Sequence, residues 1–320
     1  MKAIAILNPQ SRNGSDSGFA ATLERKLAGS IMRIERTSSP QKAAEVSRCA
    51  VRSNVETLIV AGGDGTVNAV LNSLAGTRVA LGIIPAGTAN DLASLHGIPG
   101  NVSQACDVVL ERRLRPIDLI RVNGWHYATA GGLGLPSQVA RIANAIKHRT
   151  VFGKRVDHWL DSNLYLLAAA VALITKHAPP SRAEIHWNNH SFTANLLALM
   201  ISNQPVVGRR FQLSPEAVND DGQFDVCLIE NSGSRVQSAA TLLRVLRGRH
   251  TGMKSVRIWR GERLFVCSES SIRFLADGEV HEAGRALAIE IVPRGLNLIV
   301  PNPRYQKRFQ PNASTVENRT

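Results

Sequence analysis

Short apolar runs alternate with stretches of helical periodicity over the first third of the chain. Residues 3–7 are apolar throughout, as in a strand that is buried on both faces of a parallel sheet. Phe19, Leu23 and Leu27 recur at every fourth position and predict one face of a helix. Similar runs predict three further strands, over residues 31–37, 57–61 and 79–84.

A second helix is predicted over residues 40–51. Ser39 stands where an N-cap is expected, and Pro40 occupies the first helical position, where its missing N–H does no harm. Strands that alternate with helices over short connections predict a doubly wound, mostly parallel α/β domain.

Three loops follow predicted strands, at residues 8–14, 62–68 and 85–91. The carboxyl ends of parallel strands meet at one edge of a sheet, and ligands bind there. We therefore expect the three loops to converge on one ligand site.

The loop at 62–68 reads Gly-Gly-Asp-Gly-Thr-Val-Asn and opens a segment of helical spacing. Its glycines let a ligand approach the backbone, whose N–H groups suit phosphate oxygens. Asp64 would repel a phosphate unless a divalent cation lay between them, and Mg²⁺ is the usual one. A plain Asp-Gly turn is the alternative.

The pattern changes near Ile120, where short strands separated by turn signals become dominant. They predict a mainly β domain, a sandwich or an open barrel. We therefore expect two domains. Residues 1–121 form a nucleotide-binding α/β domain, which residues 300–320 are a candidate to complete, and residues 122–299 form the mainly β domain for the lipid or other acceptor. The expected strands of the second part are 119–122, 126–130, 182–187, 191–201, 223–229, 255–259, 264–267, 272–275 and 286–291, with helices near 157–177 and 234–247.

Composition limits the classes of partner. The chain of 320 residues carries a net charge of +13, which implies an anionic partner: nucleic acid, an acidic membrane surface or a phosphorylated substrate. No nucleic-acid-binding motif accompanies the charge.

The longest apolar run, Leu164 to Ile174, is too short to span a bilayer, so we expect any membrane contact to be peripheral. Four widely spaced cysteines predict neither a zinc site nor a disulfide framework, and a cytoplasmic location is expected.

The basic residues cluster. Eight Lys or Arg lie between Arg235 and Arg263 against one acid, Glu262, and a second group lies between Arg141 and Arg155. A solvated face is one reading. Our hypothesis is that these segments include a surface that faces an anionic membrane.

Taken together, the motifs resemble the diacylglycerol kinase catalytic family. The resemblance is carried by the turn at 62–68 and by Gly-Thr-Ala-Asn-Asp-Leu-Ala at 87–93. Asn8-Pro9, the segment 215–226 and Asp277-Gly278-Glu279 are similar to further motifs of that family, in the same order. The turn at 62–68 also occurs in NAD kinases. The Gly-Thr-Ala-Asn-Asp and Asp-Gly-Glu motifs therefore distinguish the diacylglycerol kinase family from the NAD kinases.

The resemblance implies a two-domain kinase with its active site between the domains and ATP on the first domain. The residues that it assigns to the nucleotide are Asn8, Thr37, Gly62, Gly63, Asp64, Gly65, Thr66, Asn68, Gly87 and Thr88. Asp64 would orient a catalytic Mg²⁺, and Glu279 would act as general base, with Asp277 as an alternative or as an orienting residue. Asp221, with the carbonyls of Val218 and Gln223, is similar to a structural Mg²⁺ site.

Two departures from the family pattern stand out. Arg12 and Asn13 lengthen the first loop, which leaves Ser11 and Gly14 unassigned as contacts. Pro136 follows Gly-Leu-Gly-Leu where the family often has an acidic residue.

The predicted function is an ATP-dependent lipid kinase that phosphorylates a hydroxyl of diacylglycerol or a related lipid, on an anionic membrane surface. The alternatives are another acceptor (a sphingoid lipid, phosphatidylglycerol or NAD) and a non-catalytic nucleotide-binding regulator. A homodimer is one open option for the assembly.

Overall fold

The computed structural model describes residues 2–147, 181–188, 190–207, 211–212, 214–231, 234–246, 248–250 and 252–303. The chain forms two compact units. Unit 1 comprises Met1–Pro116 and the chain from Leu296 onward, and unit 2 comprises Ile117–Gly295. The helix expected at 157–177, the apolar run 164–174 and the basic residues 149–155 lie outside the described residues.

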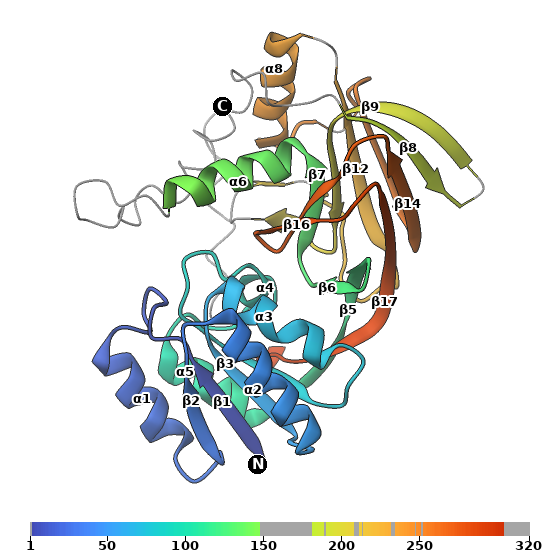
Figure 1. Cartoon of the computed structure of the whole chain (residues 1–320). Coiled ribbons are helices and arrows are strands. Elements are labelled where there is room, and N and C mark those ends of the chain that lie inside the picture. Colours follow the sequence, from blue (N-terminus) through green and yellow to red (C-terminus); the bar gives the residue numbers. More distant parts are fainter. Residues whose placement is uncertain are drawn as a thin grey trace. The chain divides into compact units, whose positions relative to one another are not determined.

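Unit 1 is built on a parallel sheet (Figure 1). Its strands are β1 (Ala3–Leu7), β2 (Arg33–Arg36), β3 (Thr57–Gly62), β4 (Ala80–Pro85) and the end of β17 (Ala286–Ile299). The order is β17-β4-β3-β1-β2, and every neighbouring pair is parallel. β1, β3 and β4 are buried along their whole length, which explains their continuous apolar sequences.

Helices cover both faces of this sheet. They are α1 (Ser17–Leu27), α2 (Pro40–Arg52), α3 (Asp64–Leu74), α4 (Asp91–Leu95) and α5 (Val102–Glu111). α1 and α5 bury apolar residues in one cluster with the alternate strand positions Ala5 and Ile59. α2 and α3 pack on each other and on β1, β3 and β4. The predicted cap is confirmed, since the Ser39 hydroxyl accepts from the N–H of Lys42 and Pro40 opens α2.

Unit 2 is mainly antiparallel β structure (Figure 1). Its strands are most of β5 (Leu114–Val122), β6 (Trp125–Tyr127), β7 (Ala130–Gly134), β8 (Ser181–Trp187), β9 (His190–Ser202), β10 (Val206–Val207), β11 (Phe211–Gln212), β12 (Phe224–Glu230), β13 (Val256–Gly261), β14 (Arg263–Ser268), β15 (Arg273–Ala276), β16 (Glu279–Glu282) and most of β17. Tyr127, Phe224 and Phe274 are fully buried in their common core. Helices α6 (Leu135–Lys147) and α8 (Arg235–Leu246) pack on the other face of β9 and β12.

The observed elements differ from the predicted ones in several places, and the short strands β10, β11 and β16 were not predicted. The strand expected at 126–130 is two strands, β6 and β7, because the chain turns at 128–129. The strand expected at 286–291 is longer: β17 runs from Ala286 to Ile299 and continues through Pro293 and a left-handed Arg294 (φ 52°). Helices α5 and α6 were not predicted, although α5 has apolar residues at helical spacing. None of the helices in the described ranges is long and apolar enough to cross a bilayer.

Candidate active site

Three loops interlock at the carboxyl ends of β1, β3 and β4. The Asn8 amide donates to the Thr66 hydroxyl at 2.9 Å, which joins the first loop to the start of α3. The backbone N–H of Asn13 donates to the carbonyl of Ala86 at 3.0 Å, which joins the first loop to the third. Thr37 follows β2 at the same edge, with its N–H bonded to the end of β1. The convergence predicted from the strand ends is confirmed.

The second and third loops touch through glycine backbone. A Cβ added to Gly87 would lie 2.5 Å from the Cα of Gly63, a distance that real Cβ contacts do not reach. The Asn90 side chain accepts from the N–H of Gly87 at 3.0 Å and donates to its carbonyl at 2.9 Å. This approach therefore requires the absence of a side chain at both glycines.

The glycine turn leaves the N-terminus of α3 without a side-chain cap, because Gly63 is the N-cap residue. Such a terminus presents unsatisfied N–H groups and the positive end of the helix dipole, and it binds phosphate. A Cβ added to Gly65 would meet none of the described atoms within 4 Å. The open space beside Gly65 is thus the place that the helix offers to a phosphate.

Asp64 links α3 to α4 through its half-buried carboxylate. One oxygen accepts from the N–H of Asn90 at 2.8 Å and the other from the N–H of Asp91 at 2.7 Å. Burial raises the pKa of Asp64 above its ordinary value, and the two N–H groups oppose the rise. Because each carboxylate oxygen has a second acceptor position, Asp64 can contact a cation while it holds α4.

All the residues predicted to contact the nucleotide lie in unit 1. They are Asn8, Thr37, Gly62, Gly63, Asp64, Gly65, Thr66, Asn68, Gly87 and Thr88. Ser11, unassigned by sequence, closes its own loop, because its hydroxyl donates to the carbonyl of Asn8 at 2.7 Å.

In unit 2, Asp277 and Gly278 form the tight turn between β15 and β16, both with positive φ (43° and 90°). The Asp277 carboxylate accepts from the N–H groups of Ala128 and Thr129 at 3.1 and 3.0 Å, and from the Thr129 hydroxyl. These bonds fix the hairpin against the chain between β6 and β7.

Glu279 begins β16 directly after this turn and is exposed. Its carboxylate makes no hydrogen bond or ion pair within the described part of the chain. The Asp-Gly-Glu motif therefore holds one carboxylate that is anchored by hydrogen bonds and one that no described residue engages.

The Asp221 loop is held by a residue that the sequence did not single out. The carboxylate of Asp118, which is 1% exposed, accepts from the N–H of Gly222 and from the N–H of Arg294, each at 2.7 Å. Its own N–H donates to the carbonyl of Asn219 at 2.7 Å. The available signal was a lone Asp among apolar neighbours in β5, a position where a carboxylate needs partners.

The predicted structural metal site contains oxygen donors and lies next to the guanidinium group of Arg260. Asp221 accepts from the N–H of Gln223 at 3.0 Å, and Arg260 lies 3.7 Å from its other oxygen. Burial raises the pKa of the neighbouring Asp225, and Arg260 lowers it. No cluster of three His, Cys, Asp or Glu side chains suited to a metal occurs in the described ranges. Carboxylate and carbonyl oxygens at 218–223 fit a hard divalent cation that keeps several waters.

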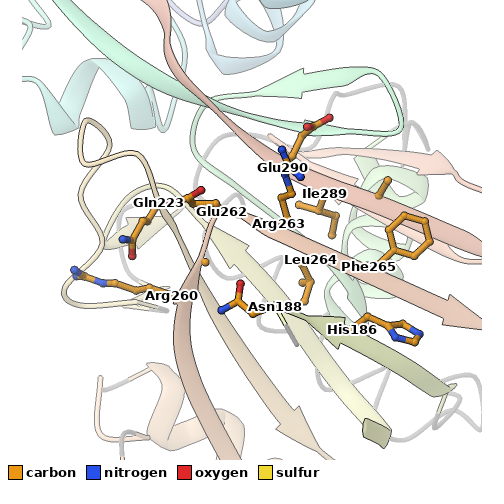
Figure 2. A pocket seen from close by; sticks show the side chains of 12 residues that line it. His186, Asn188, Gln223, Arg260, Glu262, Arg263, Leu264, Phe265, Ile289 and Glu290 are labelled. Carbon is orange, nitrogen blue, oxygen red and sulfur yellow. The ribbon is translucent and has the colours of Figure 1, made fainter. Parts of the chain in front are cut away.

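A hollow of about 950 Å³ lies on unit 2 (Figure 2). Figure 2 shows Phe265 and His186 at one end and Gln223 and Arg260 at the other. Gln223 is the only predicted site residue among the residues that line it. We therefore do not assign the chemistry to this hollow.

A parallel α/β unit together with an antiparallel, sandwich-like β unit is an NAD kinase-like architecture. An NAD kinase from Archaeoglobus fulgidus in complex with ATP shares this fold, with a TM-score of 0.52 and 12% identity, over 96% of each chain. A diacylglycerol kinase from Bacillus anthracis str. Sterne aligns with a TM-score of 0.69 and 20% identity, over 95% of this chain and 97% of that one.

Sequence comparisons identify the family. Residues 2–122 match the model of the diacylglycerol kinase catalytic domain, and residues 133–300 match the YegS C-terminal NAD kinase beta sandwich-like domain. A YegS-like lipid kinase from Klebsiella pneumoniae (strain 342) is 33% identical over 93% of this chain and 96% of its own. The diacylglycerol kinase of Bacillus subtilis (strain 168) is 27% identical over 96% of this chain and 98% of its own. The chain belongs to the diacylglycerol kinase and YegS-like family, and it is a lipid kinase that uses ATP.

Two alanine substitutions separate binding from folding at the glycine turns. Gly65→Ala has room in the protein, so the protein should fold normally while ATP binds on the order of tenfold more weakly, about 1.4 kcal/mol. Gly87→Ala collides with Gly63 and should lower the free energy of unfolding by about 2 kcal/mol. Calorimetric titration with ATP and thermal unfolding distinguish them. Unchanged ATP affinity in Gly65→Ala would remove that residue from the phosphate site.

Asp64 has a structural role that any catalytic test must take into account. Asp64→Ala leaves the N–H groups of Asn90 and Asp91 without their acceptor, so the free energy of unfolding should fall by about 2 kcal/mol in addition to any loss of turnover. Urea unfolding without nucleotide measures the first effect. Stability equal to that of the wild type would show that the link between α3 and α4 contributes nothing.

Proposed function

We propose that this lipid kinase transfers the γ-phosphoryl group of ATP to a hydroxyl of diacylglycerol or a closely related lipid, giving a phosphatidic-acid-type product. The observation that carries the proposal is the pairing, in one chain, of an open helix terminus beside Gly65 with an uncommitted carboxylate at Glu279. Phosphoryl transfer needs both a phosphate cradle and a group that takes the acceptor proton. The full-length similarity to a diacylglycerol kinase supports the choice of lipid.

We assign ATP to residues 1–121 and the acceptor lipid to residues 122–299. The triphosphate would lie at the N-terminus of α3, where backbone N–H groups receive its oxygens. Asn8 supports this cradle through Thr66. Thr37 and Thr88 stand beside it at the ends of β2 and β4 and would contact the rest of the nucleotide.

Mg²⁺ fits two places in the chain. Asp64 would hold the catalytic ion through its remaining acceptor positions, and the ion would neutralise charge on the phosphates. Asp221, with the carbonyls of Val218 and Gln223, would hold a second, structural ion. The raised pKa of Asp64 means that protonation competes with cation binding at a higher pH than for an ordinary aspartate.

Glu279 would be the general base. In the transfer, the acceptor oxygen bonds to the γ-phosphorus, its proton passes to the Glu279 carboxylate, and ADP leaves with the electrons of the broken P–O bond. Asp277 suits this role less well, because three donors already hold its carboxylate. It is better placed to position the hairpin that presents Glu279.

Substitutions at the hairpin should separate these two roles. Glu279→Gln should reduce kcat by about 10² to 10⁴-fold with an unchanged unfolding midpoint. Asp277→Asn should lower both activity and the unfolding midpoint, since an amide cannot accept from all three donors. Glu282→Gln, at the exposed end of the same strand, is the matched control and should keep wild-type kinetics. Residual activity near the wild-type level in Glu279→Gln would exclude it as the base.

The acceptor is tested with radiolabelled ATP and a panel of diacylglycerol, a sphingoid base, phosphatidylglycerol and NAD. We expect label in phosphatidic acid, with at least tenfold preference over the other acceptors. Label in NAD phosphate alone would overturn the lipid assignment. Absence of turnover with all four acceptors, together with tight ATP binding, would favour a regulator.

A further inference from the structure

Helix α8 carries hydroxyl residues on its buried face and large aliphatic residues on its exposed face. Its buried face includes the hydroxyl residues Ser238 and Thr241, at 5% and 6% exposure. Both hydroxyls donate at 3.0 Å to carbonyls one turn earlier, those of Ser234 and Gln237. The helix therefore satisfies its inward polar groups by itself and attaches to unit 2 mainly through Val245 and Leu242.

The opposite face of α8 is aliphatic and exposed. Val236 is 79% exposed and Leu243 is 53% exposed, and Ala240 is exposed between them. Spacings of four and three residues place these side chains on one ridge along the helix. Two large aliphatic side chains on the exposed face, above a buried face that includes two hydroxyls, are unusual for a solvated surface helix. The ridge thus offers an apolar surface to a partner.

Basic residues lie on α8 and in the segment that follows it. Residues 231–261 contain no Asp or Glu. Arg244 lies on α8 beside the ridge, and Arg249 and Lys254 follow the helix; all three are exposed, and none has an ion-pair partner within the described part of the chain. Gly248, with φ 62°, ends α8, and the N–H of Arg249 returns to the carbonyl of Arg244 at 2.8 Å. The end of the helix thus presents its cations from a fixed backbone.

We propose that α8 is a membrane-docking helix, whose Val236–Ala240–Leu243 ridge enters the headgroup boundary of an anionic bilayer while Arg244, Arg249 and Lys254 contact the lipid phosphates. An interfacial helix combines these features: an aliphatic ridge, a basic flank and no acid. Charge complementarity selects an anionic membrane over a neutral one. The inference deepens the proposed function, because the acceptor of a lipid kinase lies in a bilayer.

The test is co-sedimentation of the nucleotide-free, full-length protein with vesicles of phosphatidylcholine, with or without about 30 mol% phosphatidylglycerol. Val236→Ser/Leu243→Ser should bind the anionic vesicles about ten- to thirtyfold more weakly than the wild type. Arg244→Gln/Arg249→Gln should lose a similar factor on anionic vesicles, and that loss should disappear at about 0.5 M salt, where surface charges are screened. Circular dichroism and the thermal midpoint verify that each variant folds.

Met32→Ser/Leu114→Ser is the matched control. It removes two aliphatic side chains of comparable exposure, 60% and 47%, from unit 1 and should bind vesicles like the wild type. Equal vesicle binding by the α8 variants and the wild type would overturn the proposal. A second outcome would also overturn it: the Val236→Ser/Leu243→Ser variant is monomeric where the wild type is dimeric, and its vesicle binding is unchanged. That result would assign the ridge to a contact with a second copy of the chain. Because binding is measured without turnover, failure of the kinase assay leaves this test intact.

Discussion

The contact between Gly63 and Gly87 controls the geometry of unit 1. The neighbouring parallel strands β3 and β4 end at Gly62 and Pro85, and the turns that follow them can meet because neither Gly63 nor Gly87 has a side chain. The same approach places the N–H groups of Asn90 and Asp91 within reach of Asp64. One steric requirement thus sets the start of α3, the start of α4 and the open space beside Gly65.

The carboxylates of the chain differ in function because they differ in their hydrogen-bond partners. Asp64, Asp118 and Asp277 each accept from two or more N–H groups, and these bonds fix segments that are distant in sequence. The Glu279 carboxylate makes no such bonds in the described part of the chain, so both of its oxygens remain open to other partners. A carboxylate that holds backbone is suited to position a site, and an uncommitted one is suited to act within it.

Local sequence signals failed where tertiary packing decided the structure. Glycine is rare in strands, so the prediction reached only Ala130, the first residue of β7. A Cβ at Gly131 would lie 2.6 Å from the Phe274 ring, and the close packing of β7 on β15 requires glycine there. The predicted strand stopped at 291, before Pro293, but Arg294 takes a left-handed conformation and β17 continues to Ile299. The periodicity of apolar residues in α8 did not indicate that Ser238 and Thr241 are buried while Val236 and Leu243 are exposed.

The sequence by itself determined the parallel α/β unit, the β-rich second unit, the cap of α2 and the convergence of three loops at one edge of the parallel sheet. Periodicity and turn chemistry are local properties, and strand ends of a parallel sheet converge by topology alone. Only the tertiary structure showed that Asp64 holds α4, that Asp118 anchors the Asp221 loop and that Asp277 is anchored while Glu279 is not. Those distinctions depend on which N–H groups a carboxylate meets, and most of these partners lie far away in the chain.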